Sequence, residues 1–352
     1  MRIGIDARFF GPKDKGPGRY TENLIRNLEK LDIKNQYFIF LRKDNFDEYQ
    51  PQNPNFKKVL ANYKWYGWKE QLFFPFKLKK YKLDLMHFTH FNAPIFYRGK
   101  FIITIHDLIL RHFPTSRKNL RNFLFYPFKQ LMYRLAFGQV VKRAKKIIAV
   151  SRYTKKDILK YYNINPEKIE VIYEGVFQHK DVRNPQKYIL YVGNVYPHKN
   201  LENLILAFRK IKQDNFNLQL VLVGGNDYFY KKLKKNNDDV IFTGFIKDED
   251  LNILYNNAAL YVFPSLYEGF GLPPLEAMAR GLAVVSSNAT CLPEILGDAA
   301  LYFNPLDIDD IAEKIKKVLA DNNLREQLIQ KGFAQVKKYS WKKMAEETLK
   351  LY

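Results

Sequence analysis

The sequence has little cysteine, few acidic residues for its many basic ones, and no long apolar run. A single cysteine, Cys291, excludes an internal disulfide bond and any metal site built from several thiolates. No stretch approaches the roughly 18 apolar residues of a membrane-spanning helix. The first seven residues carry Arg2 and Asp6 and are typical of a strand rather than of a secretory signal peptide. We therefore expect a cytoplasmic protein.

The shortage of acidic residues leaves the chain strongly basic. There are 58 lysines and arginines against 36 aspartates and glutamates, which gives a net charge of +22 at pH 7. An excess of this size indicates an anionic partner, and nucleic acid, an acidic membrane surface and phosphorylated ligands all qualify. Apolar residues make up 47% of the 352, so the chain is globular and long enough for two α/β cores.

Short apolar runs alternate with amphipathic helical patterns twice along the chain. The first series of expected strands lies at residues 2–6, 37–41, 58–61, 85–88, 101–105, 147–150 and 169–173. The second series lies at residues 188–192, 218–223, 240–242, 259–263, 283–286 and 301–303. This alternation predicts an α/β fold with two mostly parallel sheets. We expect a first domain over 1–176, a second over 177–335, and a closing helical segment over 336–352.

The most informative stretch is FPSLYEGFGLPPLEAMA, residues 263–279. A buried strand ends where it begins, a loop with two glycines follows, and Pro273 and Pro274 predict the start of a helix. Glycine lets the backbone pass close to a ligand, and the N–H groups at a helix start can bind a phosphate. Strand, loop and helix start together favour a ligand site at this point.

Two carboxylates accompany that loop. Glu276, expected in the first helical turn, can accept two hydrogen bonds from a sugar diol such as ribose, and Glu268 can reach another part of the same ligand. A capped helix with an acidic first turn would have a similar sequence for dipole reasons alone. The second carboxylate and the two glycines favour a nucleotide-sugar site over that alternative.

Two features of the first half point to the same kind of chemistry. Residues 7–18 form a glycine-rich loop with Gly16 and Gly18, ahead of a helix expected over 19–31, an order that can cradle a phosphate but also fits a plain loop. His106 directly follows the strand at 101–105, and ligands of open α/β sheets bind beyond the carboxyl ends of strands. A structural histidine held by hydrogen bonds is the alternative.

Two further segments mix aromatic with basic residues. Trp65 and Trp68 open the first, at 65–81, and the second, at 111–146, contains no acidic residue. The basic residues of the second segment include Arg117, Lys118 and Arg121. The second segment is typical of an amphipathic helix suited to an anionic bilayer surface, although a core-facing helix with one basic side would show the same pattern.

We expect no metal. The D-x-D of Asp248 and Asp250 is better explained as a cap for the helix that follows it. His87 and His90 lack a third ligand in the sequence and are expected to shape the acceptor side of the first domain.

The segment YEGFGLPPLEAMARGLAVV, with its E-x7-E pair, resembles the retaining glycosyltransferases of family four. Support comes from YVGNVYPHKNLENLILAF, FTGFIKDEDLNILYNNAALYVFPS and CLPEILGDAALYFNP, and in the first half from GIDARFFGPKDKGPGRYTENLIRNL, TIHDL and IIAVSRYTKKDI. The resemblance covers almost the whole chain. It implies the GT-B fold, with two Rossmann-like domains facing across a cleft and a C-terminal helix that returns to the first domain.

The resemblance also implies roles for single residues. Glu276 would bind the ribose of the donor, Glu268 the transferred sugar, and Lys199 the diphosphate, with His106 near the reacting sugar. Glu268, Lys199 and His106 would be the catalytic residues. The other implied donor-binding residues are Gly16, Gly18, Gly193, Asn194, His198, Gly244, Phe245, Ile246, Gly269, Phe270, Gly271 and Leu272. The acceptor and membrane side would comprise Trp65, Trp68, His90, Arg117, Lys118 and Arg121.

One position departs from the family pattern. Many relatives have arginine five residues before the diphosphate-binding lysine, and here Asn194 stands there. One phosphate charge must then be met by another group, for which His198 is a candidate.

The resemblance implies transfer of a hexose from a nucleoside-diphosphate sugar to a lipid-linked saccharide or glycolipid, without a cofactor, at the inner face of the cytoplasmic membrane. GDP-mannose is the first expectation for the donor, and UDP-glucose and dTDP-rhamnose stay open.

A sugar-nucleotide epimerase or a glycogen synthase-like enzyme is the rival within the fold. A basic nucleic-acid-binding protein would explain the charge but not the paired glutamates, so we expect no nucleic acid. A membrane scaffold with a dead site is disfavoured by the intact glutamates and lysine.

Overall fold

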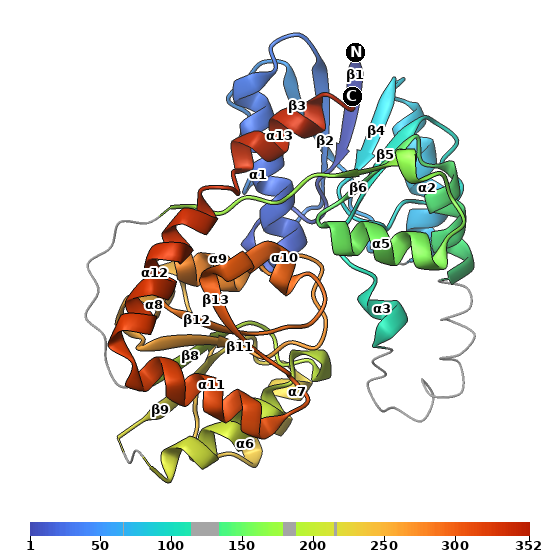
Figure 1. Ribbon diagram of the computed structural model, residues 1–352. Coiled ribbons are helices and arrows are strands. Elements are labelled where there is room, and N and C mark those ends of the chain that lie inside the picture. The colour runs from blue at the N-terminus through green and yellow to red at the C-terminus, as the bar shows by residue number, and fades with distance from the viewer. Residues whose placement is uncertain (66, 114–133, 179–187, 215–216) are drawn as a thin grey trace, which may run out of the picture. The chain divides into compact units, whose positions relative to one another are not determined.

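The computed structural model describes residues 1–65, 67–113, 134–178, 188–214 and 217–352 (Figure 1). Two compact units make up the described chain. Unit 1 comprises Met1–Gly175 and Trp341–Tyr352, and unit 2 comprises Val176–Ser340.

Unit 1 is built on a parallel sheet of seven strands in the order β3-β2-β1-β4-β5-β6-β7. The strands are β1 (Arg2–Asp6), β2 (Gln36–Leu41), β3 (Phe56–Leu60), β4 (Leu85–Phe88), β5 (Phe101–Ile105), β6 (Lys146–Ala149) and β7 (Ile169–Val171). Every residue of β4 and β5 is buried, as the strands of a parallel sheet covered on both faces must be.

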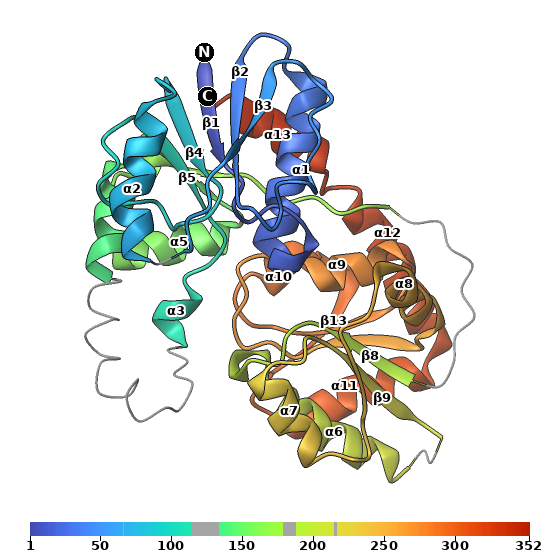
Figure 2. The same ribbon diagram turned by 180° about the vertical axis from the view of Figure 1, so that it is seen from behind.

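Helices cover both faces of this sheet. The described helices of unit 1 are η1 (Pro12–Asp14), α1 (Lys15–Leu31), α2 (Trp68–Lys79), α3 (Ile109–His112), α5 (Arg152–Tyr161), η2 (Pro166–Lys168) and α13 (Trp341–Leu349), of which η1, α3 and η2 bury no residue. Figures 1 and 2 show α1 and α13 side by side on one face and α2 on the other. The last residue, Tyr352, reaches the core of unit 1, where its hydroxyl lies 2.7 Å from Nδ1 of His87.

Unit 2 repeats the arrangement with six parallel strands in the order β10-β9-β8-β11-β12-β13. Its strands are β8 (Tyr188–Val192), β9 (Gln219–Val223), β10 (Ile241–Gly244), β11 (Leu260–Phe263), β12 (Val284–Ser287) and β13 (Ala300–Phe303). Its helices are η3 (Pro197–Lys199), α6 (Leu201–Lys212), α7 (Tyr228–Lys235), α8 (Asp248–Asn257), α9 (Leu272–Ala279), α10 (Leu292–Leu296), η4 (Gly297–Ala299), α11 (Ile308–Ala320) and α12 (Asn322–Val336).

The predicted α/β class with two parallel sheets is confirmed, and each expected strand is present with its ends within two residues of the prediction. The start of α1 was predicted too late. The helix begins at Lys15, not near 19, because η1 leads straight into it, so Gly16 and Gly18 belong to the first turns of the helix.

Two further helix starts differ from the prediction. The N-cap of α8 is Lys247, and Asp248 is the first helical residue, so the cap assigned to the D-x-D aspartates is wrong. In α9 the N-cap is Gly271, which places Glu276 at the fifth helical residue, beyond the first turn. Helix α9 therefore has no acidic side chain in its first turn.

Candidate functional site

The loop between β11 and α9 has the predicted shape. The chain leaves β11 at Phe263, and α9 starts at Leu272 with prolines in its first turn. Gly271 caps the helix with a φ of 96°, and an added Cβ would lie 2.9 Å from Cδ2 of Leu292. Only glycine adopts this conformation readily, so this glycine is required by the fold of the loop itself.

Within unit 2, the structure brings two of the predicted catalytic residues into direct contact. The ammonium group of Lys199, at the end of η3, forms an ion pair with the Oε1 atom of Glu268. The two side chains are 11% and 14% exposed, so the pair is largely shielded from water. Their loops follow β8 and β11, which are neighbours in the sheet. The carboxyl edge of the second sheet thus carries a fixed positive and a fixed negative charge side by side.

Thr290 and Cys291, the two residues before α10, hold the Glu268 loop by hydrogen bonds. The backbone N–H of Glu268 donates to Oγ1 of Thr290 at 3.1 Å, and the thiol of Cys291 donates to the carbonyl oxygens of Glu268 and Phe270, each at 3.3 Å. Burial raises the pKa of the Cys291 thiol well above its ordinary value, so it stays a neutral donor. Sequence reasoning missed this support, although Cys291 begins the quoted CLPEILGDAALYFNP segment and Thr290 directly precedes it.

Three further residues that were predicted to bind the donor lie on the segments at or after the carboxyl ends of β10 and β11. Glu276 is half-buried on α9, and its carbonyl oxygen accepts a hydrogen bond from Arg280 at 3.0 Å. Gly244 ends β10 with a φ of 74° and donates its N–H to the Tyr230 hydroxyl. Phe245, next in the chain, is 80% exposed and offers an open aromatic face. An exposed ring at a strand end is suited to stacking against a nucleotide base.

His198, the candidate for the phosphate charge that Asn194 leaves unmet, stays a prediction, and in the chain without a ligand its ring carries no charge. Burial, and then the neighbouring Lys199 ammonium, lower the pKa of His198 to about 3. The imidazole is therefore neutral near pH 7. The Oδ1 atom of Asn194 accepts a hydrogen bond from the N–H of Tyr196 at 3.3 Å, and its backbone carbonyl oxygen accepts one from the Tyr191 hydroxyl at 2.7 Å. Lys199, paired with Glu268, is the lysine that the described residues place at this edge of the sheet.

In unit 1, His106 lies directly after β5, as predicted, and both of its ring nitrogens meet acceptors. Nδ1 lies 2.9 Å from Oε1 of Glu174, and Nε2 lies 3.0 Å from the carbonyl oxygen of Thr89. Burial alone would lower the pKa of His106, but the hydrogen bond and charge of Glu174 outweigh it and raise the pKa above its ordinary value. Sequence reasoning missed Glu174, which lies 68 residues further along the chain.

The two glycines predicted to face a diphosphate have different surroundings within α1. A Cβ on Gly18 would lie 2.1 Å from the carbonyl oxygen of Gly11 and 2.7 Å from that of Phe9, so close backbone packing requires glycine there. A Cβ on Gly16 would meet no atom within 4 Å. The packing of the described residues therefore explains Gly18 and leaves Gly16 without a structural reason.

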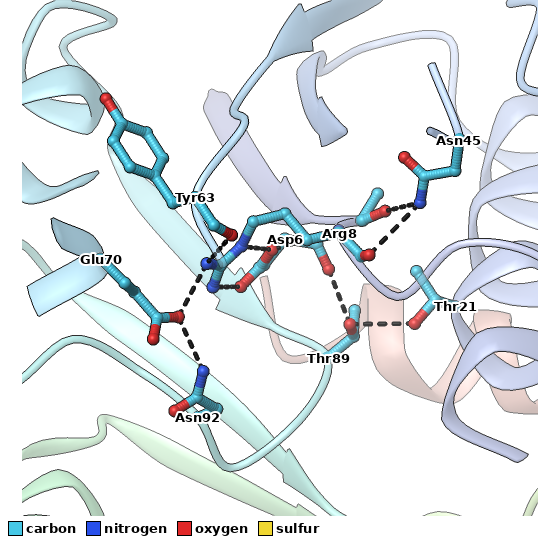
Figure 3. A network of polar contacts seen from close by, with 9 residues as sticks. Asp6, Arg8, Thr21, Asn45, Tyr63, Glu70, Thr89 and Asn92 are labelled. Carbon is cyan, nitrogen blue, oxygen red and sulfur yellow. Dashed lines mark hydrogen bonds and ion pairs between the residues drawn. The ribbon is translucent and has the colours of Figure 1, made fainter. Parts of the chain in front are cut away.

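A buried polar network holds the loops around His106, and it was not predicted from the sequence (Figure 3). The fully buried guanidinium of Arg8 lies 2.7 Å from a carboxylate oxygen of Asp6 and 2.7 Å from one of Glu70. Asn92 donates to Glu70 at 2.7 Å, and the Thr89 hydroxyl donates to the Asp6 carbonyl at 2.7 Å. These bonds tie the ends of β1 and β4 to α2 and fix the peptide whose carbonyl faces His106.

The predicted acceptor side is a stack of rings beside this network. The Phe9 ring stacks on Trp65 at 4.2 Å and lies 4.7 Å from His90, and the Arg42 guanidinium lies 3.9 Å from the Trp65 ring. Burial lowers the pKa of His90 well below its ordinary value, so this ring is neutral. Trp68, at the start of α2, is 64% exposed and lies outside the stack. The predicted basic residues Arg117, Lys118 and Arg121 lie outside the described residues.

The described residues contain no group of three or more histidine, cysteine or acidic side chains that could hold a metal ion. His87 is engaged elsewhere, with Nδ1 on Tyr352 and Nε2 2.9 Å from the Thr104 hydroxyl. Burial, and then the charge of His106, lower its pKa to about 3.

Comparisons with known proteins agree with this architecture. Residues 15–177 match the model of "Glycosyltransferase Family 4", and residues 174–335 match that of "Glycosyl transferases group 1". O-antigen chain mannosyltransferase B of Escherichia coli is 30% identical over 298 residues, which cover 78% of this chain and 75% of the relative. O-antigen chain mannosyltransferase RfbU of Salmonella typhimurium is 32% identical over 261 residues, covering 72% and 70%.

Solved structures share the fold. HepE of Anabaena, solved in complex with UDP and glucose, superposes with a TM-score of 0.76 at 17% identity and covers 100% of this chain and 99% of its own. The two-sheet architecture is thus that of the GT-B glycosyltransferases, as the motifs predicted. With its two halves matched by the family 4 and the group 1 glycosyltransferase models, and with two relatives at 30% identity or more, the chain belongs to this family of glycosyltransferases.

Proposed function

We propose that the protein transfers mannose from GDP-mannose, with retention of configuration, to a hydroxyl of a lipid-linked saccharide or glycolipid in cell-surface polysaccharide assembly. The names of the two O-antigen mannosyltransferases support the sugar and the pathway class. UDP-glucose and dTDP-rhamnose remain alternative donors, and the UDP complex of HepE supports a nucleotide sugar in general. The observation that carries the proposal is the Lys199–Glu268 pair at the carboxyl edge of the second sheet, beside the start of α9.

The charges of this pair match those that the reaction develops. As the bond to the sugar breaks, negative charge grows on the diphosphate and positive charge grows on the sugar ring. Lys199 and the backbone N–H groups of Gly271 and Leu272, just ahead of the two prolines of α9, would stabilise the diphosphate. Glu268 would hold hydroxyls of the transferred sugar, and its charge would favour the cationic ring. Each member of the pair would exchange its present partner for one part of the donor.

Glu276 would bind the donor ribose, and Phe245 would lie against the base. Glu276 is the fifth residue of α9, so its carboxylate lies outside the first turn; Pro273 and Pro274 carry no N–H, which leaves Gly271 and Leu272 as the backbone donors proposed for the diphosphate. Retaining hydrolases use a carboxylate as a covalent nucleophile. We assign no such nucleophile here, because Glu268 is proposed to bind hydroxyls and the acceptor to attack the face that the diphosphate leaves.

For the acceptor we propose contact with an anionic bilayer through α2. Four apolar side chains of this helix are exposed, namely Trp68 (64%), Leu72 (43%), Phe73 (47%) and Phe76 (68%). Glu70, Phe74 and Leu78 bury the other side of α2 against unit 1. Lys69, Lys79 and Lys80 are exposed beside the apolar side chains, which fits a negatively charged surface.

This proposal moves the membrane contact from the 111–146 segment, most of which lies outside the described residues, to α2. Within the described ranges, none of the helices has the length and apolar character needed to span a bilayer. The predicted location at the inner face of the cytoplasmic membrane is part of the same proposal.

A donor panel tests the reaction. The wild-type protein is heated with GDP-mannose, UDP-glucose or dTDP-rhamnose, and a donor at about 100 times its dissociation constant adds about 2.7 kcal/mol to stability. The stabilising donor is then incubated with membrane lipid extract, and the anomeric configuration of the product is read by NMR. We expect GDP-mannose to stabilise and α-mannose to appear on lipid. Isomerised or hydrolysed donor with no sugar on lipid would instead support the epimerase alternative, and stabilisation by no donor would overturn the proposal.

A further inference from the structure

His106 has no ring nitrogen left for proton transfer to a ligand. The partner of Nε2, 3.0 Å away, is the carbonyl oxygen of Thr89, which can only accept, so Nε2 carries a proton. The partner of Nδ1, 2.9 Å away, is a carboxylate oxygen of Glu174. The proton between Nδ1 and this oxygen belongs on the ring, because a carboxylic acid is ordinarily the stronger acid of the two. His106 is then an imidazolium that donates both of its N–H groups to the protein.

The surroundings hold this ring in one orientation. The Thr89 hydroxyl donates to the Asp6 carbonyl and receives a hydrogen bond from Thr21 at 2.9 Å, so the acceptor peptide is fixed within the network of Figure 3. The Tyr20 ring meets the His106 ring edge-on at 4.9 Å. His106 itself is 7% exposed and Glu174 is 3% exposed.

The titratable groups closest to His106 are neutral or negatively charged, which favours a positive charge on His106. His90, whose ring centre lies 6.1 Å away, and His87 both have lowered pKa values, due first to burial and then to the charge of His106. Asp107, the next residue, adds a second negative charge that favours the imidazolium. Tyr20 is neutral because burial raises its pKa. One charge, on His106, is therefore balanced chiefly by Glu174.

Glu174, the partner of His106, lies near the end of the first segment of unit 1. It follows β7 and is the last residue but one of the first segment of unit 1, where the chain continues into unit 2 at Val176. No motif of the sequence pointed to it.

We propose that Glu174 is a positioning residue that holds His106 as a fixed imidazolium, so that His106 serves glycosyl transfer by its charge and orientation and does not move protons. The kinetic part of this inference rests on the proposed function, whereas the protonation state does not. On this inference His106 neither accepts a proton from the substrate nor donates one to it.

The first experiment needs no substrate. Histidine side chains are labelled with ¹⁵N, and the His106 signals are assigned by their loss in His106→Asn. We expect both ring nitrogens to be protonated in the wild type at pH 7.5, and the ring to be neutral in Glu174→Gln, which keeps the shape but removes the charge. A neutral His106 ring in the wild type would overturn the inference whether or not the protein proves to be a mannosyltransferase.

The second experiment measures turnover against pH with the donor identified by the panel. Glu174→Gln should lower kcat about tenfold or more at pH 8 with little change in donor KM, and the deficit should shrink toward pH 6 as the ring regains its proton. Glu174→Asp, which restores the carboxylate, should recover part of the rate. A loss of kcat in Glu174→Gln that is the same at every pH would contradict the assigned role. So would a wild-type kcat that rises and falls with the protonation of His106.

A second histidine–carboxylate pair provides the matched control. His112 and Asp157 lie 2.7 Å apart between Nε2 and Oδ2, on α3 and α5. Asp157→Asn makes the same chemical change as Glu174→Gln, and we expect it to leave kcat and its pH dependence as in the wild type. An equal loss in Asp157→Asn would mean that the Glu174 effect is general to the unit and would also overturn the proposal.

Discussion

Lys199 and Glu268 form an ion pair with each other, although each is proposed to bind a different part of one donor molecule. The pair joins loops 69 residues apart in the sequence. Because both side chains are largely buried, removal of either one leaves the other without its counter-charge in a poorly solvated place.

The pair allows stability and activity to be separated. Lys199→Met and Glu268→Gln should each lower the free energy of unfolding by about 1–3 kcal/mol, and the double variant should lose much less than the sum. The activity of the double variant should not recover along with its stability, because the diphosphate still lacks its cation. Every variant without Lys199 should therefore have a kcat/KM about 10²–10³-fold lower than the wild type. Urea unfolding and donor turnover measure the two effects. Additive losses of stability would show that the pair is not coupled, and recovered transfer in the double variant would refute the role of Lys199.

Substitution of the two glutamates of the E-x7-E motif should change different kinetic constants. Glu276→Gln should weaken donor binding by about tenfold, or about 1.4 kcal/mol, with a smaller effect on kcat, since the ribose is equally bound before and during the reaction. Glu268→Gln should mainly lower kcat. Steady-state kinetics and donor titration distinguish these outcomes, with Glu313→Gln on α11, where the side chain is 68% exposed, as the control. The same kinetic signature in both glutamate variants would contradict the division of roles.

Gly16 and Gly18 form a natural matched pair. Gly18→Ala should destabilise unit 1 by about 1–3 kcal/mol, because its Cβ would overlap two carbonyl oxygens. Gly16→Ala should fold as well as the wild type or better, since alanine is favoured by up to about 1 kcal/mol within a helix. A loss of donor turnover in Gly16→Ala at unchanged stability would therefore report a close contact with a ligand. Full activity in Gly16→Ala would argue against the predicted diphosphate contact.

The exposed face of α2 predicts binding to charged vesicles. Replacing Trp68, Phe73 and Phe76 together with serine should lower affinity for vesicles that contain anionic lipid by about tenfold or more, because buried apolar area drives interfacial binding. Binding by the wild type should also weaken as salt is added. Flotation assays measure both. The control replaces two apolar residues of unit 2, Ile253 (57% exposed) and Leu306 (73% exposed), and should float as the wild type does. Equal flotation of the α2 variant and the wild type would exclude this face.

Acid should destabilise unit 1 through His87. Its pKa is about 3 in the folded chain and ordinarily near 6.5 when unfolded, so the unfolded chain binds more protons below pH 6.5. The stability due to the neutral ring is complete above the unfolded value and is lost as the pH falls, by about 2 kcal/mol between pH 7.5 and pH 5. His106, with a raised pKa, acts in the opposite sense, so the test compares the pH slope of unfolding in the wild type with that of His87→Asn. Identical slopes would contradict a neutral buried His87.

Much of the architecture was readable from local patterns. Buried parallel strands are short apolar runs, and those at β5 and β11 stand out because polar and glycine-rich residues follow them at once. The loop from Glu268 to Gly271 was predicted for the same reason. The start of α1 was not, because Gly16, Pro17 and Gly18 resemble a loop locally, whereas in the fold Gly18 lets the helix pack against the backbone of Gly11.

The sequence by itself determined the two α/β halves, the family, and the residue types available for a nucleotide sugar, since each follows from patterns within a few turns or strands. Only the tertiary structure decided which charges meet: Lys199 with Glu268, His106 with Glu174, and Arg8 with both Asp6 and Glu70. The reason is that strand order places distant strand ends side by side, and in a buried, poorly solvated setting the nearest partner sets the charge and orientation of each group.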